Sequence, residues 1–211
     1  MKLVIRKLSK KFDNNVVLDD VNLSLESGKI HGFIGRNGSG KSVLFKIICG
    51  YYTPSGGILL LDGNNYIEHF EFLPNARALI EKPSFLPDLT GFENLKLLAS
   101  IQKKIDDAAI LKTIEQLNLS TEKDKIYAKY SLGTKQKLGL AQVLMEDPDI
   151  IILDEPFNGI EKSTAEKVRN LLMKEKEKGK LILIASHIKE DIDSLADDVY
   201  EIDAGKIVKI K

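Results

Sequence analysis

Residues 35–42 read GRNGSGKS and lie between an expected strand and an expected helix. In such a loop the glycines allow backbone N–H groups to converge on phosphate oxygens, and the helix that follows directs its positive end at the same anion. The Lys41 ammonium would reach the terminal phosphates, and the Ser42 hydroxyl would be a ligand of Mg²⁺. Because an ordinary glycine turn does not require this pattern, we predict a phosphate-binding loop. Its candidate residues are Gly35, Arg36, Asn37, Gly38, Ser39, Gly40, Lys41, Ser42 and Val43.

The stretch IIILDEP places two adjacent acids, Asp154 and Glu155, directly after an apolar run. Such a run suits a parallel strand covered on both faces, and ligands in open α/β sheets bind at the carboxyl ends of the strands. Since successive strand side chains diverge, the two acids can have two functions. Asp154 would stabilise the Mg²⁺ shell, and Glu155 would orient or deprotonate an attacking water. The alternative is a loop with two solvated acids, which the apolar run disfavours.

His187 follows a second apolar run, LILIAS, and should emerge at the same edge of the sheet. A neutral imidazole there could bond the γ-phosphate of a nucleotide, or hold the water and Glu155 in line. A lone histidine is more often structural, so only its position favours the catalytic role. His31 and His69 have no comparable setting, and we assign them no role.

The periodicity of the chain indicates which elements position these residues. The early part has the period-two alternation of half-buried strands, clearest at Val21, Leu23 and Leu25. From Leu89 to about Met145 the apolar residues instead have a helical period, and strands and helices then alternate up to a terminal hairpin at DAGK. We therefore expect an α/β core with an inserted helical subdomain. The expected division of residues 1–211 is a core of 1–84 and 146–211 and a helical subdomain of about 85–145.

The overall composition argues against several classes of protein. The 31 basic and 31 acidic residues cancel, so non-specific binding to nucleic acid or anionic lipid has no global electrostatic support. The single cysteine, Cys49, cannot form an internal disulfide and suits a reducing cytosol. The N-terminus has no signal-peptide core, and nowhere do about 18 apolar residues follow one another. We expect a chain that does not itself cross a membrane.

Together these motifs resemble the ATP-binding cassette (ABC) family, the nucleotide-binding subunits of ABC transporters. Residues 130–136, YSLGTKQ, resemble the family's signature motif LSGGQ at the start of a helix. Ser131 offers a hydroxyl and Gly133 allows close backbone approach, while Leu132 and Thr134 depart from the usual glycine and glutamine. In the family, the signature of one subunit binds the γ-phosphate held by the phosphate loop of the other. The resemblance implies a P-loop NTPase core with an N-terminal antiparallel β-subdomain, and a dimer.

Further positions extend the resemblance. Phe12 resembles the aromatic residue that stacks on adenine, with a packing role as the alternative. Residues 157–161, FNGIE, resemble the D-loop, with Glu161 in place of an aspartate. Glu81 stands where a Q-loop glutamine normally contacts Mg²⁺ and transmits motion to the membrane partner. The surrounding residues 79–95 are similar to the branch of bacitracin-resistance and lantibiotic-protection transporters, in which glutamate occupies this position.

The resemblance implies an ATP-binding and ATP-hydrolysing subunit that closes around two molecules of Mg·ATP and drives a separate transmembrane permease. We expect ATP and Mg²⁺ as cofactors, a homodimer, export as the direction of transport, and no nucleic acid partner. The chain would lie in the cytoplasm at the inner face of the cell membrane, held there only through the permease. The expected metal ligands are Ser42, Glu81 and Asp154.

The permease is expected to press against the helical insertion and the Glu81 loop. Phe85, Leu86 and Phe92 are candidate contacts if they are exposed, although apolar residues at the start of a helix more often pack in the local core.

Rival functions stay open at this stage. A soluble ABC-type ATPase acting in nucleic-acid maintenance or translation is the main alternative, but such proteins carry long coiled coils, extra domains or two cassettes. A nucleotide or small-molecule kinase needs the phosphate loop but neither the signature helix nor LDEP. A non-catalytic ATP-binding module is disfavoured because Glu155 and His187 are both present.

Overall fold

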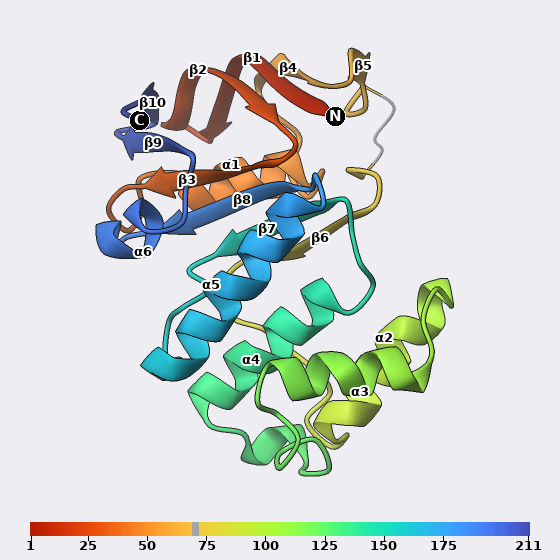
Figure 1. Ribbon diagram of the computed structural model, residues 1–211. Helices are drawn as coiled ribbons and strands as arrows, with labels where there is room; N and C mark the ends of the chain where they lie inside the picture. The colour runs from red at the N-terminus through yellow and green to blue at the C-terminus, as the bar shows by residue number, and fades with distance from the viewer. Residues whose placement is uncertain (69–71) are drawn as a thin grey trace.

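A six-stranded sheet lies at the centre of the protein, in the order β10-β9-β3-β8-β7-β6 (Figure 1). The computed structural model describes residues 1–68 and 72–211, so His69 lies outside the described residues. Strands β9 to β6 run parallel and the β9/β10 hairpin is antiparallel, so the sheet is mixed and mainly parallel, and the predicted α/β fold is confirmed. The strands are β3 (Lys29–Ile34), β6 (Ala76–Leu79), β7 (Ile150–Asp154), β8 (Leu181–Ser186), β9 (Asp198–Asp203) and β10 (Lys206–Lys209).

The central strands are apolar throughout because each face of the sheet has its own cover. Ile150 and Ile152 belong to one buried cluster, and Ile151 and Leu153 to another. The first cluster includes the apolar side chains of α1, and the second includes those of α4, α5 and α6. The covering helices are α1 (Lys41–Ile48), α4 (Leu132–Leu144), α5 (Lys162–Glu177) and α6 (Lys189–Asp193).

A second, antiparallel sheet lies beyond α1, in the order β2-β1-β4-β5 (Figure 1). Its alternating pattern buries Val21, Leu23 and Leu25 against the same cluster as α1, as the period-two alternation predicts. The N-terminal antiparallel sheet is thus confirmed. Its strands are β1 (Lys2–Phe12), β2 (Asn15–Glu26), β4 (Gly56–Leu61) and β5 (Asn64–Asn65).

Three helices gather at the far end of the molecule, drawn in green in Figure 1. They are α2 (Gly91–Gln102), α3 (Asp107–Gln116) and α4, with a 3₁₀ turn at Tyr127–Lys129 before α4. Each α-helix begins at a side-chain cap: Thr90 with Glu93 forms a capping box for α2, and Asp106 and Ser131 cap α3 and α4. The proposed division into a core and a helical subdomain stays a prediction.

The helical region packs closely on the central sheet through α4. A Cβ atom on Gly139 would lie 2.9 Å from both Leu79 Cδ1 and Pro83 Cβ, so this position has no room for a side chain. Phe85 and Phe92 are half-buried and pack against the buried cluster that includes α4, which is the local packing that the sequence favours for them. Leu86 is exposed as expected.

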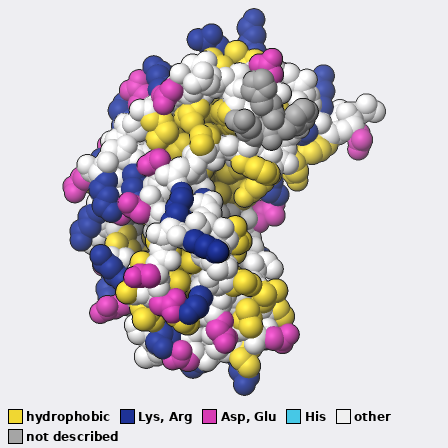
Figure 2. Space-filling view, turned by 90° about the vertical axis from the view of Figure 1, so that its right-hand side faces the viewer, with side chains coloured by type: hydrophobic (Ala, Val, Ile, Leu, Met, Phe, Trp, Pro, Cys, Tyr) yellow, Lys and Arg dark blue, Asp and Glu magenta, His cyan; other side chains and the backbone are white. Residues whose placement is uncertain are grey.

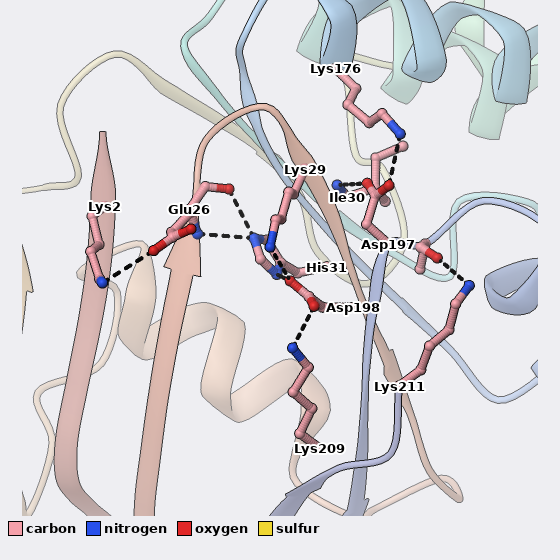
Figure 3. A network of polar contacts seen from close by, with 11 residues as sticks. Lys2, Glu26, Lys29, Ile30, His31, Lys176, Asp197, Asp198, Lys209 and Lys211 are labelled. Carbon is pink, nitrogen blue, oxygen red and sulfur yellow. Dashed lines mark hydrogen bonds and ion pairs between the residues drawn. The ribbon is translucent and has the colours of Figure 1, made fainter.

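The amino ends of β3 and β9 carry a network of polar contacts (Figure 3). His31 is fully buried, and its Nε2 lies 3.1 Å from Glu26 N and 3.0 Å from Glu26 O. Its Nδ1 lies 3.4 Å from Asp198 Oδ2, and the Asp198 carboxylate also accepts hydrogen bonds from Lys29 and Lys209. This network ties the start of β9 to β3 and to the C-terminal strand β10. It gives His31 a place in the structure away from the phosphate loop.

Two further expectations concern Cys49 and membrane crossing. Cys49 is buried in the cluster beside α1, and burial raises the pKa of its thiol to about 12, which leaves it an unreactive packing residue. Within the described residues, no helix has both the length and the apolar character that crossing a membrane requires.

Candidate nucleotide-binding site

The phosphate loop connects β3 to α1 in a path that requires glycine. Gly38 and Gly40 have φ angles of 81° and 110°, in the left-handed region that other residues avoid. A Cβ atom on Gly35 would lie 2.4 Å from the carbonyl oxygen of Ile202 at the end of β9. The sequence pattern therefore produces a tight backbone turn at the carboxyl end of the central strand β3.

The N-terminus of α1 is suited to an anion. Its N-cap residue, Gly40, makes no side-chain cap, and the first turn of α1 has no acidic residue. The backbone N–H groups of this turn therefore have no competing negative partner on the helix itself. Lys41 is 6% exposed, and its Nζ donates hydrogen bonds to Gly35 O at 2.7 Å and Arg36 O at 3.1 Å. An ammonium has three donors, so one remains for a phosphate oxygen.

Ser42 and Asp154 meet across the gap between α1 and β7. Ser42 Oγ donates to Asp154 Oδ2 at 2.5 Å, and Asp154 Oδ1 is buried without a hydrogen-bond partner in the described residues. Asp154 is 4% exposed, and this burial raises its pKa although the Ser42 hydrogen bond acts in the opposite direction. A hard divalent cation would compensate for the burial and use the free oxygen. These two side chains therefore fit the predicted Mg²⁺ site.

The cation would need ligands from outside the chain. No group of three or more His, Cys, Asp or Glu side chains gathers as a metal cage within residues 1–68 and 72–211. A site with one hydroxyl and one carboxylate is typical of Mg²⁺ held together with nucleotide phosphates and water.

Glu155 is held between the ends of β7 and β8. Its Oε1 accepts a hydrogen bond from His187 N at 2.9 Å and lies 2.9 Å from His187 Nδ1, while Ser186 Oγ donates to Oε2 at 3.3 Å. The backbone of Glu155 has φ of 51°, an uncommon conformation for a residue with a side chain. The structure therefore brings together the predicted acid and the predicted histidine, with the carboxylate oriented by three contacts.

Glu81 also has a left-handed backbone, with φ of 63°. Its Oε1 lies 2.5 Å from Lys46 Nζ on α1, so the carboxylate is in an ion pair with a side chain that the sequence did not mark. The hydrogen bond that Lys46 donates to the Glu81 carboxylate is the main cause that raises the pKa of Lys46. Glu81 thus lies beside the predicted metal site, with a lysine as its present partner.

The signature turn has its own internal contacts. Ser131 Oγ accepts a hydrogen bond from Thr134 N at 3.2 Å and lies 2.8 Å from Thr134 Oγ1, so Thr134 partners the serine where the family has glutamine. A Cβ atom on Gly133 would lie 2.3 Å from Gly159 O, which joins this turn to the predicted D-loop. Leu132, which lies between Ser131 and Gly133 in the chain, is 60% exposed.

Gln136 connects helix α4 to the residues that follow strand β7. Its Nε2 donates hydrogen bonds to Glu155 O at 3.1 Å and Pro156 O at 3.3 Å, although the residues lie 19 and 20 positions apart in the chain. Gln136 lies within the motif of residues 130–136, but the sequence predicted no role for it. The contact fixes the end of β7 to the first turns of α4.

Most of the side chains and loop residues described above line one cleft of about 460 Å³. Some of the residues that line this cleft were predicted from the sequence, and other lining residues were not. The predicted lining residues are Asn37, Gly38, Gly40, Lys41, Ser42, Val43, Glu81, Asp154 and Glu155. The missed ones are Val17, Lys82, Leu132, Gln136 and Asn158. Leu132 and Gln136 could have been found from the signature motif, Lys82 from its place beside Glu81 and Asn158 from the D-loop, whereas no local pattern marks Val17.

Other predicted residues lie outside this lining. Arg36 and His187 line a neighbouring hollow together with Gly35. Phe12 is 39% exposed, and its ring contacts Tyr52 edge-on at 5.5 Å. Gly35 and Ser39 form the base of the loop, and Ser131 and Gly133 form the signature turn. Their predicted ligand contacts stay predictions.

Comparisons with known proteins agree with the site. A family model described as ABC transporter matches residues 18–158. Bacitracin transport ATP-binding protein BcrA of Enterococcus faecalis is 36% identical over 204 residues, which are 96% of this chain and 66% of BcrA, so the chain spans just under two thirds of BcrA. Lantibiotic transport ATP-binding protein SrtF of Streptococcus pyogenes is 31% identical over 206 residues, 98% of this chain and 89% of SrtF. A solved ATP-binding subunit of an ABC transporter has a TM-score of 0.88 and 25% identity, covering 100% of this chain and 90% of that one. The chain belongs to the ABC transporter family.

Proposed function

We propose that the chain is the ATP-binding and ATP-hydrolysing subunit of an ABC transporter. One observation carries this proposal: the phosphate loop, the Ser42–Asp154 pair and the Glu155–His187 pair converge at the carboxyl ends of β3, β7 and β8. The three features are a loop that can bind phosphate, a pair of side chains that can hold Mg²⁺ and a carboxylate held in a fixed position. Phosphoryl transfer to water requires all three.

Each group has a distinct part in the reaction. The backbone of the phosphate loop and Lys41 would bind the nucleotide phosphates, and Ser42 and Asp154 would hold Mg²⁺. Bound Mg²⁺ would neutralise phosphate charge. Glu155 would orient a water and accept its proton, because its carboxylate is the acid held at the strand end with a fixed direction. His187, at 2.9 Å from Glu155, would keep that carboxylate in line.

We further propose a homodimer that closes around two molecules of Mg·ATP. The signature turn supports this part, because Ser131 is exposed and Leu132 projects at the rim of the cleft rather than into the core. A second copy could bring its own α4 N-terminus to the γ-phosphate held by this chain. When the dimer closes, two parts of each chain would behave as separate bodies. These are the core of residues 1–84 and 146–211 and the helical subdomain of about 85–145.

The transporter would also contain a separate transmembrane permease on which this chain sits at the cytoplasmic face. Figure 2 shows hydrophobic side chains gathered above and below a narrowing on one face of the molecule. Among the exposed apolar residues, Tyr51 and Phe72 have ring centroids 6.0 Å apart and line a hollow of about 260 Å³. We propose this hollow as a permease contact. The names of BcrA and SrtF support transport of bacitracin or a lantibiotic, and we propose export as its direction.

The rival function, a soluble ATPase acting on nucleic acid or in translation, has less support. The sequence has equal numbers of basic and acidic residues, and nucleic acid binding is driven mainly by positive charge. The relatives named above are transport proteins.

The proposed function is tested with Glu155→Gln. Removing the carboxylate should lower ATP turnover by about 100-fold or more, the usual contribution of a general base, while ATP binding is retained. The variant should therefore accumulate an ATP-bound dimer, measured by size-exclusion chromatography with and without Mg·ATP. A tagged form of the variant, purified from solubilised membranes, should co-purify with a membrane protein that has several spanning segments.

The matched control is Glu166→Gln, an exposed acid on α5. It should leave turnover and the dimer equilibrium unchanged. Turnover of Glu155→Gln equal to that of the unmodified chain would remove Glu155 as the base. Failure of the unmodified chain to bind ATP would overturn the proposed function altogether.

A further inference from the structure

The carboxylate of Glu81 lies at the cleft but has a partner on α1. Glu81 lines the same cleft as Ser42 and Asp154, yet its Oε1 is 2.5 Å from Lys46 Nζ. A neutral glutamine, the usual residue of the family at this position, could not form this ion pair. The carboxylate at this position therefore makes a contact with Lys46 that a glutamine would not make as an ion pair.

Lys46 is well placed for such a contact. It follows Ser42 by four residues on α1, so the two side chains share one helical face. The Lys46 ammonium also lies 5.4 Å from the centroid of the Tyr52 ring, a cation–π distance. Its side chain is 20% exposed, whereas that of Glu81 is 61% exposed. The lysine is thus the fixed member of the pair, and the glutamate is the member with freedom to turn.

We propose that Lys46 is a positioning residue that competes with Mg²⁺ for the Glu81 carboxylate. When Mg·ATP loads, the cation takes this carboxylate from Lys46, and the loop that carries Glu81 is released from α1. The proposal rests on the proposed function, because it requires a Mg·ATP site at Ser42 and Asp154. An ion pair with one exposed partner contributes little free energy, so a divalent cation can displace the lysine readily.

The competition predicts the effect of each substitution. Without the Lys46 ammonium, the Glu81 carboxylate has no rival partner and binds the cation at a lower concentration. Without the Glu81 carboxylate, the presence of Lys46 should no longer matter. The two residues must therefore act non-additively, which a double-mutant cycle measures directly.

The experiment uses Mn²⁺ as the probe for the metal. Free Mn²⁺ is followed by electron paramagnetic resonance while it is titrated into the full chain with a non-hydrolysable ATP analogue. The proteins are the unmodified chain, Lys46→Met, Glu81→Gln and the double variant. Methionine keeps the unbranched stem and helix propensity of lysine, and Lys46→Gln is a second variant should the first fold poorly. The matched control is Lys112→Met, an exposed position on α3.

Lys46→Met should lower the half-saturating Mn²⁺ concentration by about two- to five-fold, the range of a partly exposed ion pair. The same substitution in the Glu81→Gln background should cause no change, and neither should Lys112→Met. An equal shift in both backgrounds would overturn the proposal, because Lys46 would then act only as a general positive charge. No shift in either background would also overturn it. If the unmodified chain does not bind the ATP analogue, the proposed function fails and this inference fails with it.

Discussion

The two ends of the central sheet show opposite treatments of polar groups. At the carboxyl ends of β3, β7 and β8, Asp154 has a buried oxygen that finds no partner among the described residues, and two of the three donors of the Lys41 ammonium are used. At the amino ends of β3 and β9, the carboxylate of Asp198 lies against Lys29, Lys209 and His31 (Figure 3). One end keeps its binding capacity open for a ligand, and the other uses it to hold the fold together. The difference predicts which substitutions change binding and which change stability.

The largest effect should come from the open end, at Lys41. Lys41→Ala should weaken ATP binding by about 100-fold, because it removes a charged donor to the phosphates. Fluorescence titration with a labelled ATP analogue measures this loss. Lys29→Ala, at the closed end, should leave the affinity unchanged. Equal losses in the two variants would mean that the ends do not differ in function.

A smaller effect is expected at the closed end, at Asp198. Asp198→Asn keeps the shape of the side chain but removes the negative charge of the carboxylate, which accepts hydrogen bonds from Lys29 and Lys209. The free energy of unfolding should fall by about 2 kcal/mol, typical of a hydrogen bond to a charged group, with no change in ATP affinity. Urea unfolding provides the measurement, and Asp193→Asn, at an exposed position, is the control. A loss of ATP affinity in Asp198→Asn would contradict the separation of the two ends.

The smallest effect concerns pH. Burial lowers the pKa of His31 below its ordinary value of 6.5, although the Glu26 carbonyl and the Asp198 carboxylate act in the opposite direction. As the pH falls below 6.5, the unfolded chain therefore takes up a proton at His31 before the folded chain does. The contribution of His31 to stability is full above this pH and is lost as the pH falls towards the lowered pKa.

Urea unfolding between pH 7.5 and about 5.5 tests this expectation. The free energy of unfolding should fall with pH more steeply in the unmodified chain than in His31→Gln, by at most about 1.4 kcal/mol per pH unit. A difference of the opposite sign would mean that His31 is protonated in the fold. His187→Gln is the control at the other end of the sheet.

Local patterns predicted the elements and the phosphate loop because each depends on neighbours in the chain. The run IIILD is buried on both faces, and the glycines of the loop have the left-handed angles that their pattern requires. The close meeting of Glu155 and His187 followed from the rule that parallel strands end at one edge. These features need no knowledge of distant side chains.

Long-range side-chain contacts could not be predicted in the same way. The pairing of Glu81 with Lys46 joins residues 35 positions apart, and that of Gln136 with Glu155 joins residues 19 apart. The sequence likewise left open whether Phe85 and Phe92 are exposed or packed, because the cluster against which they pack includes helices later in the chain. Polar and aromatic residues at loop ends have several possible partners, and only the folded chain selects among them.

The close approach of Gly133 to Gly159 has a consequence for how this sequence can evolve. Any side chain at position 133 would collide with the Gly159 carbonyl, so a change there needs a simultaneous change in the loop at 157–161. The neighbouring positions have no such restriction: Leu132 is largely exposed, and Thr134 partners Ser131. The two departures from the usual signature, Leu132 and Thr134, therefore lie on either side of a residue that cannot vary alone. Substitutions in the signature turn at Gly133 and in the loop at 157–161 must therefore occur as coupled changes.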